Sequence, residues 1–394
     1  MVVLVTDAEN RASLAITRSL GRLGHEVVVG GRHLSGLAQS SRYCAAAVQY
    51  PDPVRDSDAF VEAVANITRE RRVDALIPVG DITTFLITGH REKFECGVPF
   101  APAAVVERAA DKVDILRTAE RIGLPVPRSV LVSSASEADA GGVLGFPLVI
   151  KPWRSRVRTP AGWASSSVSY AADRGQLARD LESRPVHEFP ILLQERVIGP
   201  GMGVFTCYRN GKPVVLFGHR RLRERPPWGG VSVLSESVSI DPVAAGFATR
   251  LLDAIGWEGI AMVEFKLDER DGLPKLMEIN GRFWGSLQLA IDAGVNFPEI
   301  LLRAVSGQPN ALQPPYRVGV RNRWFWGDVD SLLVTMFGGS GRPPMTHGHG
   351  RLAALAAFAR FGGANSYYDN PKRDDPWPFV VEGSDWLRRL VSRD

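Results

Sequence analysis

Residues 261–285, AMVEFKLDERDGLPKLMEINGRFWG, predict a β-hairpin around which the rest of the chain can be arranged. Residues 261–267 and 276–280 are rich in apolar residues and alternate as two strands would. Asp271-Gly272 supplies the turn chemistry between them. The stretch therefore indicates two antiparallel strands joined by a short loop.

Polar side chains of this hairpin converge on one face. Because side chains alternate along a strand, Glu278 and Asn280 share a face, and the odd loop sets Glu264 opposite Glu278. Two carboxylates and an amide oxygen are typical ligands of Mg²⁺. Arg282 follows closely and can bring a guanidinium fork to a phosphate or carboxylate beside the metal. The alternative is an ordinary hairpin whose acidic side chains face solvent.

The length and the composition set outer bounds on the architecture and on the partners. A chain of 394 residues is too long for one compact core, which predicts two or three domains. With 45% hydrophobic and 23% charged residues, the composition is that of an ordinary soluble globular protein. An arginine-lined site for anions accounts for the net charge of +4, so we expect no nucleic-acid partner.

Cysteine usage and the hydrophobic runs bear on the compartment. The three cysteines are scattered without a C-x-x-C pair, which argues against a disulfide framework or a zinc site and favours a reducing cytoplasm. The apolar run of residues 1–5 is too short for a signal-peptide core, and no run is long enough to span a membrane. We therefore expect a cytoplasmic protein.

The N-terminal part has the pattern of a parallel α/β sheet. Strands are predicted at residues 2–6, 26–29 and 75–79, with helices at residues 10–23 and 60–71. Strand–helix–strand at this spacing is typical of a βαβ unit. The first strand is not followed by G-x-G-x-x-G, so a dinucleotide site would lack its phosphate turn.

Two lysines of the next part of the chain lie in predicted elements. Lys112 lies within a predicted helix at residues 105–122, and Lys151 ends the predicted strand at residues 145–152. The loop at residues 153–169 is rich in arginine and serine and can fold over phosphates. The alternatives are a lysine that only snorkels to solvent and a flexible surface loop.

A cationic cluster at residues 219–224 follows a predicted strand and precedes a glycine pair. Such a cluster usually decorates a solvated face, but it can also bind the carboxylate of a substrate. The substrate residues that this interpretation proposes are Arg221, Arg223, Gly229 and Gly230. Further helices are predicted at residues 242–255, 286–293, 297–305 and 351–361.

Five short motifs, each weak alone, follow one another along about residues 105–305: Asp111-Lys112, FPLVIKP (146–152), QERV (194–197), MVEF (262–265) and MEINGRF (277–283). Taken together, this ordered series resembles the ATP-grasp superfamily, closest to the carbamoyl phosphate synthetase-like branch with its carboxylate–amine ligases. The resemblance implies an ATP-grasp fold of the α/β class, with α+β ATP-binding lobes. The ranges it implies are a Rossmann-like precursor domain (1–104), a small lobe (105–190), a large lobe with the Mg-ATP site (191–312) and a mainly helical extension (313–394).

The resemblance also implies roles for individual residues. Lys112 and Lys151 would contact ATP phosphates, Glu195 and the backbone of Val197 would bind the adenine, and Arg282 with Lys151 would be catalytic. Mg²⁺, or Mn²⁺ in its place, would be held by Glu264, Glu278 and Asn280. One departure stands out, since Met202 occupies the region where several relatives carry an acid for the ribose hydroxyls.

The resemblance implies an ATP-dependent ligase that activates a small carboxylate as an acyl phosphate and joins it to a small amine or thiol. Backbone donors at the glycine pair would stabilise the oxyanion. An ATP-dependent carboxylase or phosphoryl transferase is the alternative within enzymes, and a nucleotide-binding regulatory protein without turnover is the alternative outside them. A homodimer is left open.

Overall fold

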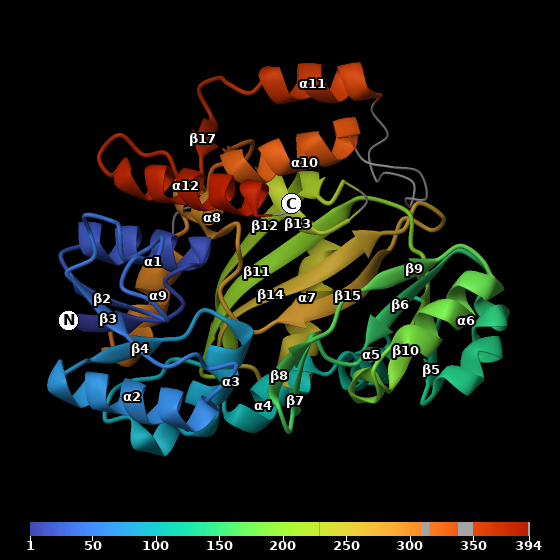
Figure 1. The fold of residues 1–394 in the computed structure, drawn as a ribbon, viewed down its shortest axis with the longest axis horizontal. Coiled ribbons are helices and arrows are strands. Elements are labelled where there is room, and N and C mark those ends of the chain that lie inside the picture. Colours follow the sequence, from blue (N-terminus) through green and yellow to red (C-terminus); the bar gives the residue numbers. More distant parts are fainter. Residues whose placement is uncertain (228, 309–314, 338–349, 393–394) are drawn as a thin grey trace.

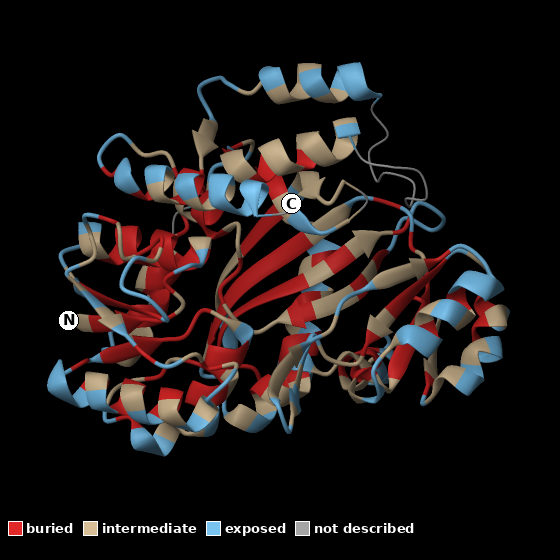
Figure 2. Ribbon diagram, in the orientation of Figure 1, coloured by how far each residue is buried: buried red, intermediate tan, exposed pale blue. Residues whose placement is uncertain are grey.

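The structure, a computed structural model, describes residues 1–227, 229–308, 315–337 and 350–392. Two four-stranded sheets flank a seven-stranded sheet, and helices of the C-terminal part cover one end of the large sheet (Figure 1). Buried residues are concentrated in the strands of all three sheets, whereas exposed residues lie mostly on the outer helices and loops (Figure 2).

The first sheet is parallel, with the strand order β3-β2-β1-β4. Its elements are β1 Val2–Val5, α1 Arg11–Arg22, β2 Glu26–Gly31, β3 Ala46–Gln49, α2 Ser57–Glu70, β4 Ala75–Ile77, α3 Asp81–Gly89 and a 3₁₀ turn at Arg91–Lys93. The chain moves from β1 outward to β3 and then returns to β4 on the other side of β1. The predicted parallel βαβ unit is confirmed.

Two helices, α4 Ala103–Ala110 and α5 Lys112–Arg121, replace the single helix predicted at residues 105–122. The break falls at Asp111, whose extended backbone leaves the helical path. Its carboxylate accepts hydrogen bonds from the backbone N–H groups of Val113 and Asp114 and so caps α5. Lys112 therefore opens a helix instead of lying within one.

The second sheet is antiparallel, with the order β5-β10-β6-β9. Its elements, with the hairpin and helices of the same segment, are β5 Ser129–Val132, a 3₁₀ helix at Ala135–Leu144, β6 Leu148–Pro152, β7 Arg156–Thr159, β8 Gly162–Ser165, β9 Ser169–Ala171, α6 Arg174–Ser183, a 3₁₀ turn at Val186–Glu188 and β10 Ile191–Glu195. Since β10 pairs with β5 and β6, it belongs to this sheet, although the expected ranges placed it with the next one.

The large sheet has the order β15-β14-β11-β12-β13-β16-β17. The elements that precede the C-terminal part are β11 Gly201–Arg209, β12 Lys212–Arg225, β13 Val231–Val238, α7 Pro242–Ile255, β14 Gly259–Leu267, β15 Pro274–Asn280, α8 Leu287–Ala293 and α9 Phe297–Val305. In the hairpin of β14 and β15, Glu264 lies opposite Glu278, as predicted.

The C-terminal part is joined to the rest of the molecule through strands as well as helices. Its described elements are β16 Arg321–Arg323, α10 Phe325–Phe337, α11 Arg351–Ala359, β17 Ser366–Tyr368 and α12 Trp377–Val391. β16 pairs with β13, which makes this part an extension of the large sheet. The division into four domains is still a proposal.

A buried ion pair fastens the C-terminal part to α1. Arg18 donates from Nε to Asp375 at 2.8 Å and from Nη1 to the carbonyl oxygen of Asn370 at 2.9 Å. The carboxylate of Asp375 also accepts hydrogen bonds from the Ser41 hydroxyl and the Arg42 backbone N–H. Both charged side chains are 1% exposed, so this contact belongs to the interior of the molecule.

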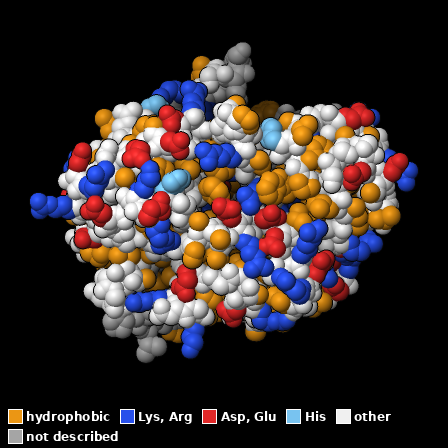
Figure 3. Space-filling view, turned by 90° about the horizontal axis from the view of Figure 1, so that it is seen from below, with side chains coloured by type: hydrophobic (Ala, Val, Ile, Leu, Met, Phe, Trp, Pro, Cys, Tyr) orange, Lys and Arg blue, Asp and Glu red, His pale blue; other side chains and the backbone are white. Residues whose placement is uncertain are grey.

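Within the described part of the chain, no helix has the length and apolarity that a membrane span requires. Basic and acidic side chains are interspersed over the face seen in Figure 3, which is hollowed near its middle.

Candidate functional site

The hairpin of β14 and β15 brings three predicted metal ligands together. The amide nitrogen of Asn280 donates to Glu264 at 3.1 Å and to Glu278 at 3.3 Å. Its side chain therefore lies between two carboxylates that face one another across the strand pair.

Ionisation of these two carboxylates is opposed by burial, and a bound cation would offset that unfavourable free energy. Burial raises the pKa of Glu264, and the negative charge of Glu278 adds to the rise. At Glu278 burial opposes ionisation, but Lys112 and Lys151 outweigh it and lower the pKa. Four carboxylate oxygens and one amide group are a donor set that suits a hard divalent cation. The residues present therefore fit Mg²⁺ or Mn²⁺.

The two predicted phosphate lysines reach the same place from different elements. Lys112, at the start of α5, lies 3.7 Å from Glu278 and donates to the hydroxyl of Ser155 at 2.9 Å. Lys151, on β6, donates to the side-chain oxygen of Gln194 at 2.7 Å. Burial lowers the pKa of Lys151 to about 8, against the opposing charge of Glu278.

The lowered pKa of Lys151 predicts how ATP affinity depends on pH. A triphosphate attracts the ammonium form, so binding above pH 8 must take up a proton. We expect the affinity for ATP to fall by up to about tenfold per pH unit above that value. Calorimetric titration with a non-hydrolysable ATP analogue measures this slope.

Lys151→Arg is the matched variant, because a guanidinium stays protonated over the whole range. It should flatten the pH dependence above pH 8, whereas Lys151→Met should bind weakly at every pH. A parent protein whose affinity is flat above pH 8 would show that Lys151 does not face the triphosphate.

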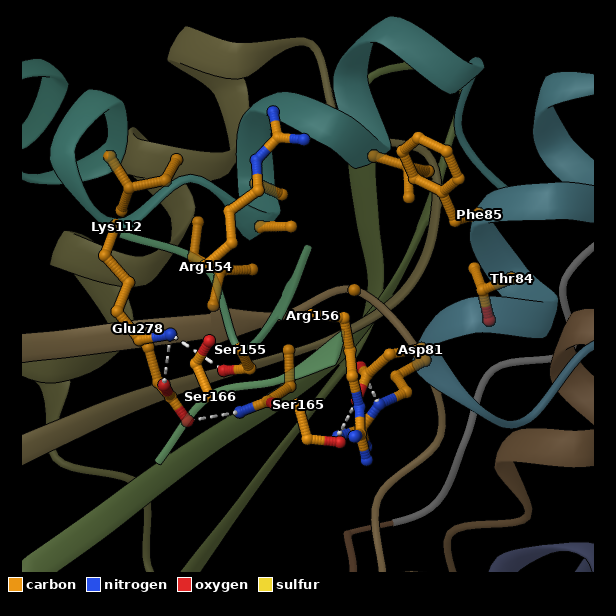
Figure 4. Close-up of a pocket in the computed structure, with 18 of the residues that line it drawn as sticks. Asp81, Thr84, Phe85, Lys112, Arg154, Ser155, Arg156, Ser165, Ser166 and Glu278 are labelled. Atoms are coloured by element: carbon orange, nitrogen blue, oxygen red, sulfur yellow. Dashed lines mark hydrogen bonds and ion pairs between the residues drawn. The ribbon is translucent and has the colours of Figure 1, made fainter. Parts of the chain in front are cut away.

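A cavity of about 350 Å³ adjoins these groups (Figure 4). Lys112 and Glu278 face one another on one side of it, and Asp81 and Arg156 lie on the other. Arg282 also lines the cavity and is paired with Asp81, including a 3.3 Å bond to the second carboxylate oxygen. Although burial opposes it, Arg282 lowers the pKa of Asp81 and keeps that carboxylate charged. Asp81 thus orients the predicted catalytic arginine from the first sheet.

The hairpin of β7 and β8 forms part of the same cavity and is fastened to the first sheet's segment. The Trp163 backbone N–H donates to the carbonyl oxygen of Val54 at 3.0 Å, and its indole N–H donates to the Ser57 hydroxyl at 3.0 Å. Its ring packs edge-on against Phe85 at 5.1 Å. Gly162 permits this approach, since a Cβ there would lie 2.4 Å from the Val54 oxygen. The arginine- and serine-rich loop is therefore an anchored hairpin.

The two predicted adenine residues are placed differently from one another. The side chain of Glu195 is held by Arg128 and Arg270 in bonds of 3.0–3.1 Å. Hydrogen bonding to Arg270 is the main cause that lowers the pKa of Glu195 to about 2. Because neighbours on a strand face opposite ways, it is Gln194 that lies beside Lys151. The Val197 carbonyl oxygen follows β10 and accepts a 3.4 Å bond from Lys266.

The cationic cluster lies within β12, not after a strand, and its arginines diverge. Arg221 is paired with Glu264 and with Glu224, the latter at 3.0 Å, and it donates to the carbonyl oxygen of Gly230. Arg223 is paired with Asp328 of α10. An irregular register between Arg221 and Arg223 opposite β13 reverses the alternation of faces. Arg221 therefore lies beside the predicted metal ligands, whereas Arg223 points toward the C-terminal helices. Gly229, the other glycine of the predicted pair, lies near the hydroxyl of Tyr170.

Because the two arginines point in different directions, replacing each by methionine should affect a different property, turnover for Arg221 and stability for Arg223. Arg221→Met should lower ATP turnover by at least about tenfold, because it removes the charge that stabilises ionised Glu264. Arg223→Met should lower the free energy of unfolding by about 1.5–3 kcal/mol and leave substrate KM values unchanged. Steady-state kinetics and chemical denaturation of both variants measure the contrast. An increase in KM for the Arg223 variant would contradict this placement.

The roles of several residues of the site are not predicted by the sequence motifs. Asp81 opens a helix 201 positions before its partner Arg282. Gln194 lies within the QERV motif, next to the predicted adenine residue Glu195. The docking of Trp163 on Val54 depends on contacts between segments more than 100 residues apart. Only the alternation of faces along β10 could have pointed to one of them.

Comparison with known proteins now identifies the fold and the family. The profile described as "ATP-grasp in the biosynthetic pathway with Ter operon" matches residues 189–326, which contain the β14–β15 hairpin. The chain has an ATP-grasp fold, and its residues 189–326 match an ATP-grasp family. The family expected from the motifs is confirmed, as is the α/β ATP-grasp fold.

The relatives of this ATP-grasp protein include ligases and carboxylases. The carbamoyl phosphate synthase large chain of Thermotoga neapolitana is 25% identical over 335 residues, which cover 80% of this chain and 29% of that one. L-amino acid ligase from Bacillus licheniformis matches with a TM-score of 0.63 and 18% identity, over 80% of this chain and 77% of that chain. The biotin carboxylase domain of Hydrogenobacter thermophilus 2-oxoglutarate carboxylase, a dimer described with MgADP and bicarbonate, matches with a TM-score of 0.63 and 17% identity, over 81% and 73%. The chain spans 22% and 29% of the length of the first two curated relatives.

Proposed function

We propose that this ATP-grasp protein is an ATP-dependent ligase that converts a small carboxylate to an acyl phosphate and transfers the acyl group to an amine. The observation that carries the proposal is the convergence of Lys112, Glu278, Asn280 and Arg282 on one cavity between the sheets. A carboxylate is a poor acyl donor because attack on it must expel oxide. Phosphorylation supplies a good leaving group, and the amine then displaces phosphate.

In this proposal the cations of the chain act on the phosphoryl group that is transferred. Lys112 and Lys151 offset charge on the triphosphate from two sides. Glu264, Glu278 and Asn280 would hold the divalent cation, which supplies charge neutralisation between the phosphates when bound. Trp163 and its hairpin limit access of water to the cavity.

Arg282 is proposed to orient the carboxylate and to stabilise its acyl phosphate. Its bonds to Asp81 fix the direction of the guanidinium fork, which leaves less freedom to lose on binding. Asp81 is therefore a positioning residue of the proposed reaction.

A screen of phosphate release tests this function. ATP and Mg²⁺ are incubated with single amino acids and small acids, and then with the same compounds in pairs that supply an amine or a thiol. The ligase proposal expects phosphate release that requires a carboxylate together with an amine, and an amide product by mass spectrometry. ADP formation that requires bicarbonate instead would indicate a carboxylase, a candidate supported by the similarity to biotin carboxylases. Nucleotide binding without turnover for every pair would favour a regulatory protein.

A further inference from the structure

A second cavity, of about 440 Å³, lies at the carboxyl edge of the first sheet. Its wall contains residues that lie one to three positions beyond the ends of the parallel strands, namely Asp7 after β1, Arg32 after β2, Asp52 after β3 and Val79 after β4. In open parallel sheets, ligands bind outside the carboxyl ends of the strands where the strand order reverses. Here the order reverses between β1 and β4, the two strands that end at this cavity.

The ends of β1 and β4 are fixed to one another around Asp7. Its carboxylate accepts a 2.8 Å bond from the Gly80 backbone N–H and a 2.6 Å bond from the Thr83 hydroxyl. Asp7 has a left-handed backbone conformation, with φ of 59°, which is uncommon for a residue other than glycine. Partial burial raises the pKa of Asp7, and this half-buried carboxyl group lies at the place where parallel α/β sheets hold a ligand.

The charged side chains of this cavity carry a small excess of negative charge. Asp7, Glu9, Asp52 and Asp81 contribute four carboxylates. Three arginines, Arg32, Arg156 and Arg282, line it as well, so the described lining residues carry one carboxylate more than they carry guanidinium groups. Arg32 is 47% exposed and lies 3.3 Å from Glu9 and 3.4 Å from Asp52, so one solvated guanidinium is shared between two carboxylates. A bound cation would relieve the excess negative charge.

The two cavities meet at residues of the proposed active site. Asp81, Arg156 and Arg282 line both of them, so a ligand in the second cavity can extend to the phosphoryl transfer site. We propose that the second cavity binds a positively charged substituent, an ammonium or guanidinium group, of the amine substrate, whose reacting nitrogen lies at this border. The assignment rests on the proposed ligase function and narrows its substrate to diamines and basic amino acids.

Binding without nucleotide tests the assignment separately from catalysis. Calorimetric titrations compare 1,4-diaminobutane with butylamine, and L-lysine with L-norleucine, so each pair differs in one terminal cation. In each pair, the parent protein should bind the member with the additional ammonium group at least about tenfold more tightly. The double variant Glu9→Gln, Asp52→Asn should abolish this preference and keep the parental affinity for ATP. Asp139→Asn, which removes an acid that is 91% exposed on the second sheet's segment, is the matched control and should retain the preference.

The outcomes separate the two proposals. Equal binding of the members of each pair, no binding of any cationic probe, or an unchanged preference in the double variant would overturn the assignment of the cavity. Each single variant, checked by its thermal midpoint, shows whether misfolding explains a loss of binding. If the charged probes bind as expected but none supports phosphate release with any carboxylate, the ligase proposal fails and the cavity assignment stands. If only uncharged amines are ligated, with the same KM in the double variant, the ligase proposal stands and the cavity assignment fails.

Discussion

Replacing Glu278 by glutamine is expected to lower ATP-dependent turnover about a thousandfold while the fold stays intact. Glu278 faces Glu264 across the hairpin, contacts Asn280 and lies 3.7 Å from Lys112. The substitution removes one charged oxygen ligand where phosphoryl charge develops, and several kcal/mol of transition-state stabilisation are lost with it. ADP formation at saturating ATP and Mg²⁺ measures the effect.

The same variant has a second readout that does not depend on activity. Without metal, Glu278→Gln relieves the repulsion on Glu264, but it also removes the attraction of Lys112 and Lys151 that lowers the pKa of Glu278, so its thermal midpoint should be slightly lower than that of the parent. Addition of Mg²⁺ with an ATP analogue should stabilise the parent and have little effect on the variant. Asp271→Asn, in the exposed turn of the same hairpin, is the control and should keep turnover within about twofold. Turnover of Glu278→Gln within about tenfold of the parent would rule out its role as a metal ligand.

The second large effect is expected on stability, from Arg18→Met on α1. The guanidinium of Arg18 makes three hydrogen bonds to Asn370 and Asp375, and both members of the ion pair are 1% exposed. Its removal leaves a buried carboxylate without its cation, which typically costs about 3–5 kcal/mol of unfolding free energy. Urea denaturation followed by tryptophan fluorescence measures the loss, because Trp377 follows Asp375 by two positions.

Arg22→Met, one turn further along α1, is the matched control for that experiment. Arg22 is paired with Asp374, but these side chains are 35% and 45% exposed. An exposed ion pair contributes about 0–1 kcal/mol, so the control should unfold close to the parent. Equal destabilisation by the two substitutions would show that the buried pair contributes no more than the exposed one.

The hairpin of the site could be predicted because its two strands alternate and share one turn, which sets Glu278 and Asn280 on one face. The pairing of Glu264 with Glu278 also depends on an irregularity in the register between Glu264 and Phe265, which the alternation does not report. The helix at residues 105–122 was predicted as continuous because its apolar spacing continues through Asp111. Capping of α5 by that carboxylate competes with helix continuation, and the apolar pattern does not report such a competition.

Other parts of the site depend on events that a pattern along one strand does not contain. Arg221 and Arg223 would share a face on a regular strand, but an irregular register opposite β13 separates them. The pairing of Arg282 with Asp81 joins the large sheet to the first one across 201 positions. Such contacts follow from the packing of whole segments. The sequence therefore predicted that Glu264, Glu278 and Asn280 lie together, whereas the positioning of the arginines was left undetermined.

The ion pair between Arg18 and Asp375 can form only late in the synthesis of the chain. The two residues are 357 positions apart. At about 5–20 residues per second, a ribosome needs roughly 20–70 s to deliver the second partner after the first. During that interval the Arg18 side chain has only water and neighbouring polar groups to solvate it, because its carboxylate has not been made. Dehydration of this guanidinium is consequently among the last events in the maturation of the nascent chain.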